Sequence, residues 1–141
     1  MKYYEAGAAI AAPPERVWEI LTDGGGYTSW DSGVEKVSGR IAPGEKITVV
    51  SKASPGRAFP VTVAEFTPSR RMTWKGGMPL GLFTGVRTFT LTPDGDGHTR
   101  FTMREEYTGP LLGLIWRSMP DLQPSFNQFA NGLKHRAEQP A

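Results

Sequence analysis

Hydrophobic and polar positions alternate with a period of two through most of the chain, and Gly, Pro, Ser and Asp interrupt the alternation at regular spacing. Residues 1–10 begin this pattern, with Tyr4, Ala6, Ala8 and Ile10 on one face. A period of two is typical of strands that bury one face. The pattern predicts antiparallel strands at residues 1–10, 34–39, 46–52, 59–67, 72–76, 83–93 and 99–108.

The period changes to that of a helix at two places. After the first strand, Pro13, Pro14 and Glu15 suit the first turn of a helix, because this turn tolerates proline and favours an acidic side chain. Glycines 24–26 end that helix, and a short helical turn follows at residues 27–31. After Gly109 and Pro110 the pattern turns helical again. Its apolar stripe is Leu122, Phe126, Phe129 and Leu133, with Asp121 as the expected N-cap and Asn127, Gln128 and Asn131 directed to solvent.

This order of elements predicts an α+β protein with the helices segregated to the ends of the chain. A curved antiparallel sheet with the long amphipathic C-terminal helix across its concave face would bury both apolar patterns. The sequence contains no internal repeat and no linker, so we expect one domain over residues 1–141.

Composition excludes several kinds of chemistry. The 141 residues contain 16 basic and 14 acidic side chains, two histidines and no cysteine, for a formal net charge of +2. Without cysteine there is no disulfide, thiolate nucleophile or cysteine-based zinc site, and we expect no metal and no cofactor. The charges form no basic stripe of the kind that binds nucleic acid. No apolar run reaches the length of a membrane span, and the first residues lack a secretory signal, so a cytoplasmic location is expected.

Strand alternation places two opposite charges on the apolar inner face. In 83–93, Arg87 shares a face with Phe83, Phe89 and Leu91, and in 99–108, Glu105 shares a face with apolar neighbours. If the turn at 94–97 pairs Leu91 with Phe101, Phe89 opposes Met103 and Arg87 opposes Glu105. One interpretation is a salt bridge that satisfies two ions on an apolar wall. The other is a polar anchor in a hydrophobic pocket, in which the Arg87 guanidinium fixes a carbonyl, phenolate or carboxylate of the ligand and Glu105 acts as acid or base. Arg87 can also stabilise an oxyanion.

The same alternation adds Met72 and Trp74 to the expected pocket, and Trp30, Met78, Trp116, Phe126 and Phe129 are expected to complete its lining. Large apolar side chains fill every protein interior, so core packing is the competing interpretation for each of them. The segment 76–85 is too apolar for an ordinary turn and is expected to form a mobile lip over the entrance. The expected lining residues are Trp30, Met72, Trp74, Met78, Phe83, Arg87, Phe89, Met103, Glu105, Tyr107, Trp116, Phe126 and Phe129.

Several segments together resemble a known superfamily. They are residues 10–23 (IAAPPERVWEILTD), 27–30 (YTSW), 63–74 (VAEFTPSRRMTW), 83–91, 105–112 (EEYTGPLL) and the helix 126–138. In this order they resemble the helix-grip or SRPBCC superfamily, which includes START domains, the birch-pollen allergen fold and polyketide cyclase/dehydrase-like proteins. The resemblance implies a seven-stranded antiparallel sheet wrapped around the C-terminal helix, with two short helices after the first strand. It also implies a cavity that binds hydrophobic molecules. Relatives often carry histidine at the position of Arg87, so a histidine-based mechanism does not transfer.

Three functions remain open at this point. The leading hypothesis is binding of a small hydrophobic or amphipathic molecule, such as a lipid or polyketide, with Arg87 and Glu105 orienting its polar end. The first alternative is a cyclase, dehydratase or aromatase that uses the same two residues. The second alternative is a protein-interaction module of the chaperone-activator type. A cavity larger than about 300 Å³ beside Arg87 favours the first two, and a filled core favours the third. The sequence leaves the oligomeric state open.

Overall fold

The computed structural model describes residues 1–140, and its elements follow the predicted order. All predicted strands are present, with ends within about two residues of the expected ones. The elements are β1 (Lys2–Ile10), α1 (Pro14–Thr22), η1 (Gly24–Ser29), β2 (Val34–Ser38), β3 (Lys46–Ser51), β4 (Ala58–Thr67), β5 (Arg71–Gly77), η2 (Pro79–Gly81), β6 (Thr84–Pro93), β7 (Thr99–Thr108), α2 (Leu112–Ser118) and α3 (Gln123–Glu138).

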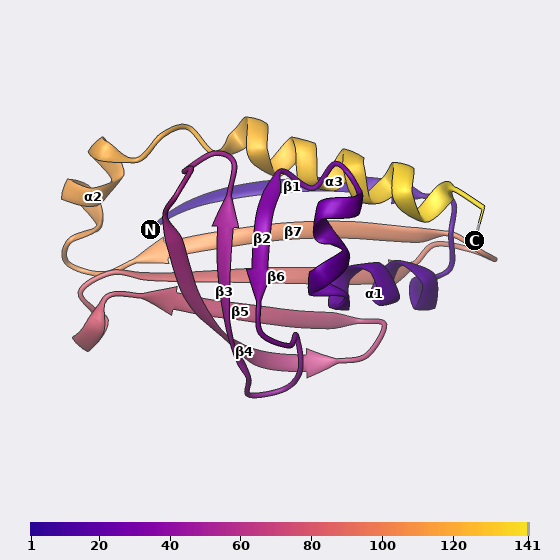
Figure 1. The fold of residues 1–141 in the computed structure, drawn as a ribbon, viewed down its shortest axis with the longest axis horizontal. Helices are drawn as coiled ribbons and strands as arrows, with labels where there is room; N and C mark the ends of the chain where they lie inside the picture. The colour runs from indigo at the N-terminus through magenta and orange to yellow at the C-terminus, as the bar shows by residue number, and fades with distance from the viewer. Residues whose placement is uncertain (141) are drawn as a thin grey trace.

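The strands form one seven-stranded antiparallel sheet in the order β1-β7-β6-β5-β4-β3-β2 (Figure 1). The register of β6 on β7 is the predicted one, with Leu91 opposite Phe101 and Arg87 opposite Glu105. The short turn between these long strands fixes that register, because a slip of one residue would turn the apolar face outward.

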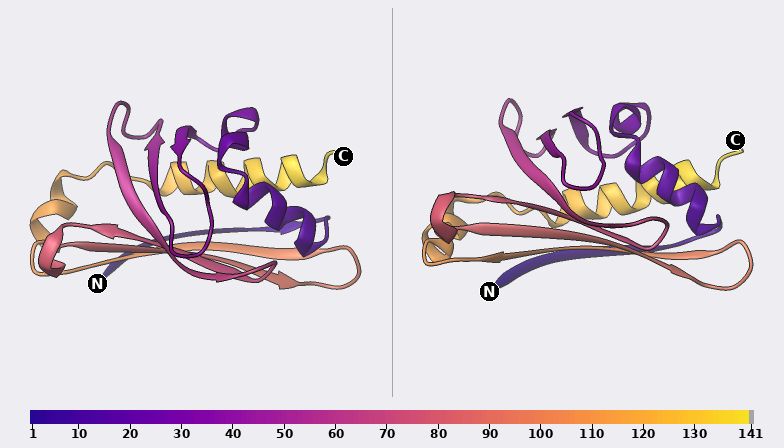
Figure 2. Two further views of the ribbon diagram at one scale, coloured as in Figure 1. Left: turned by 60° about the horizontal axis from the view of Figure 1, so that its bottom comes forward. Right: turned by 90° about the horizontal axis from the view of Figure 1, so that it is seen from below.

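The sheet curls around α3. Strands β1, β7, β6 and β5 run nearly along the helix, and β2, β3 and β4 rise beside it (Figures 1 and 2). A register shift in β4 between Val63 and Glu65 contributes to the bend, since an extra residue increases the local twist. The backbone N–H of Glu65 donates to Thr73 Oγ1 at 3.0 Å, so the irregularity keeps a hydrogen bond.

The helices near the N-terminus differ in detail from the prediction. Helix α1 begins at Pro14, so this proline lies in its first turn, and the helix buries Val17, Trp18 and Leu21 as expected. The expected turn at residues 27–31 begins earlier, as the 3-10 helix Gly24–Ser29. The side chain of Asp23 accepts a hydrogen bond from Gly26 N at 3.2 Å, so the glycines start this helix instead of only ending α1.

The C-terminal part contains two helices, whereas the sequence pattern predicts one. The short helix α2 has no fully buried residue, and residues 119–122 separate it from α3. Leu122, not Asp121, takes the cap position of α3, although the Asp121 carboxylate accepts from Gln123 N at 3.0 Å. No helix within residues 1–140 is long and apolar enough to cross a membrane.

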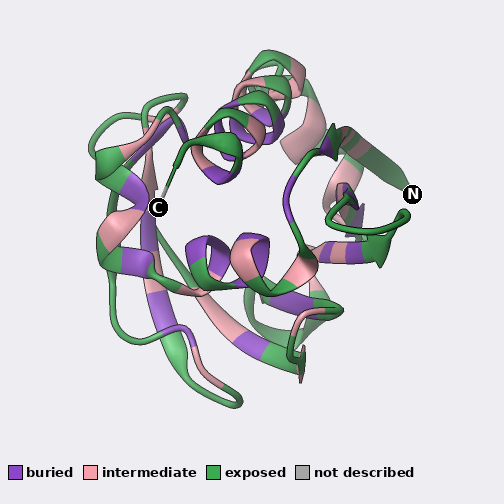
Figure 3. Cartoon of the chain, turned by 90° about the vertical axis from the view of Figure 1, so that its right-hand side faces the viewer, coloured by how far each residue is buried: buried purple, intermediate pink, exposed green. Residues whose placement is uncertain are grey.

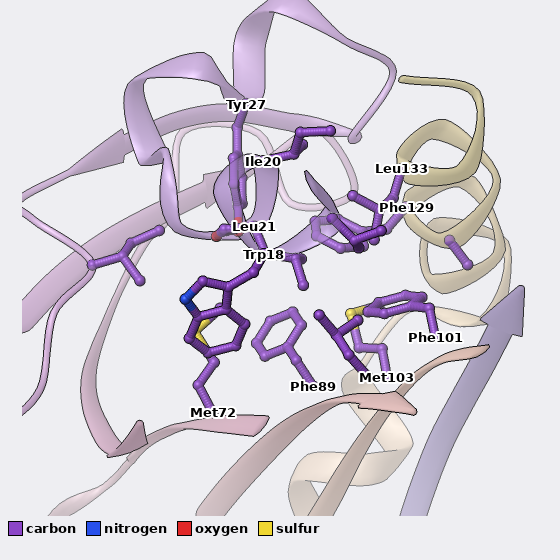
Figure 4. Packing of buried hydrophobic residues seen from close by; sticks show 14 of the residues in the cluster. Trp18, Ile20, Leu21, Tyr27, Met72, Phe89, Phe101, Met103, Phe129 and Leu133 are labelled. Atoms are coloured by element: carbon purple, nitrogen blue, oxygen red, sulfur yellow. Dashed lines mark hydrogen bonds between the residues drawn. The ribbon is translucent and has the colours of Figure 1, made fainter. Parts of the chain in front are cut away.

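One end of the space between sheet and α3 is tightly filled. Helix α1 covers this end, and the buried faces of α1 and α3 point toward each other and the sheet (Figure 3). Buried side chains from β5, β6, β7, α1 and α3 pack against one another there (Figure 4). We call this the closed end; it contains Ile10, Val17, Leu21, Met72, Phe89, Leu91, Phe101 and Leu133.

Candidate functional site

Three consecutive rows of side chains on the concave face of β5, β6 and β7 lead from the closed end to an open one. The first row is Met72, Phe89 and Met103, all fully buried. The second row is Trp74, Arg87 and Glu105, and the third is Gly76, Gly85 and Tyr107. The rows thus change from large apolar side chains to an ion pair and then to two glycines.

Beyond the first row the interior opens into a cavity of about 580 Å³. Its walls come from all strands except β1, with only Val34 contributed by β2, and α2, the α2–α3 connection and α3 cover it. This volume lies within the usual range for small-molecule sites. We call this part of the molecule the hollow end; its lining includes Val34, Val49, Ser51, Phe59, Val61, Trp74, Gly76, Met78, Phe83, Gly85, Arg87, Met103, Glu105, Tyr107, Ile115, Met119, Leu122, Ser125, Phe126 and Phe129.

Arg87 and Glu105 form an ion pair in the cavity wall, with Arg87 Nε 2.7 Å from Glu105 Oε1. Their side chains are 24% and 17% exposed. The Phe126 ring lies against the guanidinium, with Arg87 Cζ 4.8 Å from the ring centroid. Burial lowers the pKa of Arg87, but the charge and hydrogen bond of Glu105, together with the nearby Tyr107 and Tyr27 side chains, outweigh burial and raise the pKa. Arg87 is therefore a permanent cation and cannot act as a proton shuttle.

Two further polar groups lie within the cavity wall without a partner. Among residues 1–140, Trp74 Nε1 and the Tyr107 hydroxyl are buried and make no hydrogen bond. Burial raises the pKa of Tyr107, and the nearby Glu105 carboxylate raises it further, so the phenol stays neutral. An unpaired buried donor costs about 1–3 kcal/mol, so each of the two groups would gain from a hydrogen-bond acceptor.

The two glycines make the third row hollow. Gly76 pairs with Gly85 across β5 and β6. A Cβ on Gly85 would lie 2.8 Å from Glu105 Oε2, and one on Gly76 would lie 2.8 Å from the Pro60 carbonyl oxygen. Gly85 therefore leaves room for the carboxylate, and Gly76 allows β4 to approach β5 where the sheet bends.

Most of the residues expected from the sequence lie at this cavity, but four do not. Those in its lining are Trp74, Met78, Phe83, Arg87, Met103, Glu105, Tyr107, Phe126 and Phe129. Met72 and Phe89 point to the concave face as expected, yet they belong to the closed end and are fully buried. Trp30 packs against Tyr27 and Phe129, outside the lining. Trp116 stacks on Tyr4, with ring centroids 5.2 Å apart, on the other side of Tyr107.

Several lining residues are not among those expected from the sequence. Phe59, Val61 and Val49 alternate on β3 and β4, so their inward direction was readable, but only the curl of the sheet brings them to the cavity. Ile115 lines the cavity in place of its neighbour Trp116. Successive residues on a helix point about 100° apart, so the orientation of α2 decides between them.

The segment 76–85 borders the cavity, as the expected lip would. Met78 and Phe83 are in the lining, and the Met78 N–H donates to the Phe83 carbonyl oxygen at 2.8 Å. Leu80, at the tip of the loop, is 96% exposed and has a φ of 61°. That conformation is uncommon for a residue other than glycine. The apolar tip thus lies outside the cavity.

The chemistry of the site is that of an apolar container with one ion pair. Within residues 1–140, no three His, Asp or Glu side chains lie together as ligands for a metal ion. The polar groups that can act on a bound molecule are the guanidinium, the carboxylate and nearby hydroxyls such as Ser125. This set can hold and orient a ligand, and Glu105 can exchange a proton with it.

Comparison with known proteins agrees with this geometry. The family model for polyketide cyclase/dehydrase and lipid transport proteins matches residues 4–138. The chain belongs to this family. A comparison with curated proteins finds no matching sequence.

Solved structures show the same fold. A START superfamily protein from Mycobacterium smegmatis superposes with a TM-score of 0.72 at 15% identity, covering 97% of each chain. The Zhui aromatase/cyclase from Streptomyces sp. R1128 has the same TM-score and identity, covering 97% of this chain and 93% of that one. A hypothetical protein from Helicobacter pylori gives 0.76 at 12% identity, over 97% and 88% of the two chains. The likeness to START proteins confirms the predicted α+β helix-grip fold and the SRPBCC resemblance.

Proposed function

We propose that this polyketide cyclase/dehydrase and lipid transport family member binds a small hydrophobic or amphipathic molecule in the hollow end. The observation that carries the proposal is the cavity of about 580 Å³ whose apolar walls enclose one ion pair. The apolar walls favour transfer of a hydrophobic ligand from water, at about 25 cal/mol per Å² of apolar surface buried. Arg87 and Glu105 orient the polar end of the ligand.

The cavity weighs against the protein-interaction alternative. A module that acts through its outer surface gains nothing from an unfilled interior, and an empty apolar volume lowers stability. A container for a ligand accounts for the space.

The test uses Nile red, a neutral solvatochromic dye that fluoresces in apolar surroundings. We expect the wild-type protein to bind the dye and Phe126→Ala to bind it at least about tenfold more weakly, since the ring lines the cavity and covers Arg87. The matched control is Phe66→Ala, because Phe66 packs on Trp18 away from the cavity. Absence of binding by the wild type, or equal losses in both variants, would refute the proposal.

A second candidate is an enzyme of the cyclase or dehydratase type. It is favoured by Glu105 Oε2, which faces the space above Gly85 and accepts no hydrogen bond from residues 1–140. A carboxylate so placed can take a proton from a bound ligand while Arg87 stabilises the developing oxyanion. If a substrate is found, Glu105→Gln should abolish turnover and leave the substrate bound. Full activity in this variant would remove Glu105 from the mechanism.

A further inference from the structure

The charges in the cavity cancel. Among residues 1–140, the ionisable side chains in the lining that carry charge are Arg57, Arg87 and Glu105. Arg57 is exposed and lies over the Phe59 ring, with its Cζ 5.6 Å from the ring centroid, so water solvates it. The interior therefore contains one cation and one anion in direct contact.

The ion pair leaves hydrogen-bonding capacity of both kinds unused. Arg87 Nε and Glu105 Oε1 bond to each other. The two Nη atoms of Arg87 and the Oε2 atom of Glu105 have no hydrogen-bond partner within residues 1–140. The pair thus offers N–H donors and a carboxylate acceptor side by side. Gly85 leaves room for Oε2, and the Tyr107 ring is the other side chain next to this position.

A charged head group fits this arrangement poorly. An anion placed against Arg87 would also lie close to the Glu105 carboxylate. Repulsion from this carboxylate would leave the attraction to Arg87 too weak to offset the full cost of desolvating the anion. A cation near Glu105 would meet Arg87 in the same way. A neutral group that accepts from the guanidinium and donates to the carboxylate satisfies both partners and disturbs neither charge.

We propose that the ligand's polar end is electrically neutral and both accepts and donates hydrogen bonds, as an alcohol, a hydroxy ketone or a primary amide does. Carboxylates and phosphate monoesters are the head groups this cavity rejects. The inference rests on the proposed function and narrows its ligand class. It makes Glu105 the residue that sets charge selectivity, because without its negative charge the interior becomes cationic.

The first test compares two ligands with the same chain on the wild-type protein. Each ligand, dodecan-1-ol or dodecanoate, is titrated against bound Nile red, and its displacement of the dye is measured. The titrations are made at about pH 8, where dodecanoic acid is ionised, and below the concentrations at which either ligand forms micelles. We expect the alcohol to bind at least about tenfold more tightly, a difference of about 1.4 kcal/mol. Equal or tighter binding of dodecanoate would overturn the inference and leave the proposed function standing. If Nile red itself does not bind, the proposed function fails.

The second test reverses the preference. In Glu105→Gln the amide keeps the size of the side chain and removes its charge, so Arg87 is free to pair with an anion. We expect dodecanoate to bind this variant at least about tenfold more tightly than it binds the wild type. The matched control is Glu106→Gln on the same strand, since Glu106 is exposed and pairs with Arg104 on the convex face. Dodecanoate affinity that is unchanged in Glu105→Gln, or that rises equally in both variants, would refute the role of Glu105.

Arg57 provides a check on the orientation of the ligand. If a carboxylate bound with its head at the mouth instead of at the ion pair, Arg57→Gln would bind dodecanoate more weakly than the wild type does, and Glu105→Gln would not bind it more tightly. We expect instead that Arg57→Gln does not bind dodecanoate more weakly than the wild type does and that Glu105→Gln binds it more tightly. The wild-type comparison remains decisive even if Glu105→Gln fails to fold.

Discussion

The closed end and the hollow end share strands β5, β6 and β7, yet side chains fill the closed end and leave a cavity in the hollow end. Phe101 and Tyr107 share the concave face of β7, six residues apart. Phe101 is fully buried among side chains of the closed end, whereas Tyr107 borders the cavity. The opposing residues on β6 are Leu91 for Phe101 and Gly85 for Tyr107. A large side chain meets its partner at one end and a glycine leaves space at the other.

The cover differs as well. Over the closed end, α1 and α3 each contribute buried side chains, among them Leu21 and Leu133. Over the hollow end, α2 has no fully buried residue, and it is followed by the connection through Met119 and Pro120. A short helix with few buried contacts is held weakly. On the proposed function, the difference separates two tasks: the closed end supplies stability, and the hollow end takes up and releases the ligand.

The largest expected effect breaks the closed end. We expect Phe101→Ala to lower the free energy of unfolding by about 3–5 kcal/mol, because it removes a fully buried ring from a packed core. Phe83→Ala should cost less than about 1.5 kcal/mol, since this ring is only half-buried and stacks on Tyr107 beside the cavity. Urea unfolding measures both changes.

Dye binding should show the reverse order for the same two variants. Phe83→Ala is expected to weaken Nile red binding by about fivefold or more, because it removes part of the apolar lining. Phe101→Ala, measured at a temperature where it is folded, should stay within about threefold of the wild type, because Phe101 lies outside the lining. Similar stability losses for both rings would show that the two ends are not distinct.

Local pattern was sufficient to predict the sheet and the ion pair. Alternation assigns each β6 and β7 residue to a face, and the turn between Pro93 and Thr99 sets the register. The contact between Arg87 and Glu105 follows from those two facts, since residues directly opposite on antiparallel strands touch. The prediction needed no knowledge of the rest of the molecule.

The rest of the cavity depends on features that local pattern does not contain. The curl of the sheet brings Val49 and Phe59 toward α3, and it results from irregular pairing and twist accumulated over several strands. Alternation also cannot tell where along the concave face packing stops, so Phe89 and Arg87 were indistinguishable as lining residues. Trp116 is expected in the lining from the sequence, but it contacts Tyr4 and Tyr107 and lies outside the lining.

A smaller effect is expected when the hollow row is filled by one methyl group. Gly85→Ala places a Cβ only 2.8 Å from the position of Glu105 Oε2, so the carboxylate must move. We expect unfolding free energy to change by less than about 1 kcal/mol, since the displaced atom is the end of a flexible side chain. Dodecan-1-ol affinity should fall by about threefold to tenfold. The control is Gly113→Ala in α2, where a Cβ meets nothing within 4 Å. Equal affinities in both variants would show that Gly85 does not shape the site.

The smallest effect concerns a surface contact that ties the closed end together. Glu138, in α3, accepts from Ala11 N at 2.9 Å and pairs with Lys134. The hydrogen bond from the Ala11 backbone, and then Lys134, lower the pKa of Glu138 from its ordinary value. A carboxyl whose pKa is lowered by folding stabilises the folded state above its unfolded-state pKa, and it loses that contribution as the pH falls through the lowered value.

We expect Glu138→Gln to cost no more than about 1 kcal/mol of unfolding free energy near neutral pH, and the difference from wild type should shrink below about pH 4. The matched control is Glu35→Gln, at an exposed β2 residue with no ion pair in residues 1–140. Thermal unfolding between about pH 3 and 7 measures it, and a cost for Glu138→Gln that grows on acidification would contradict the sign.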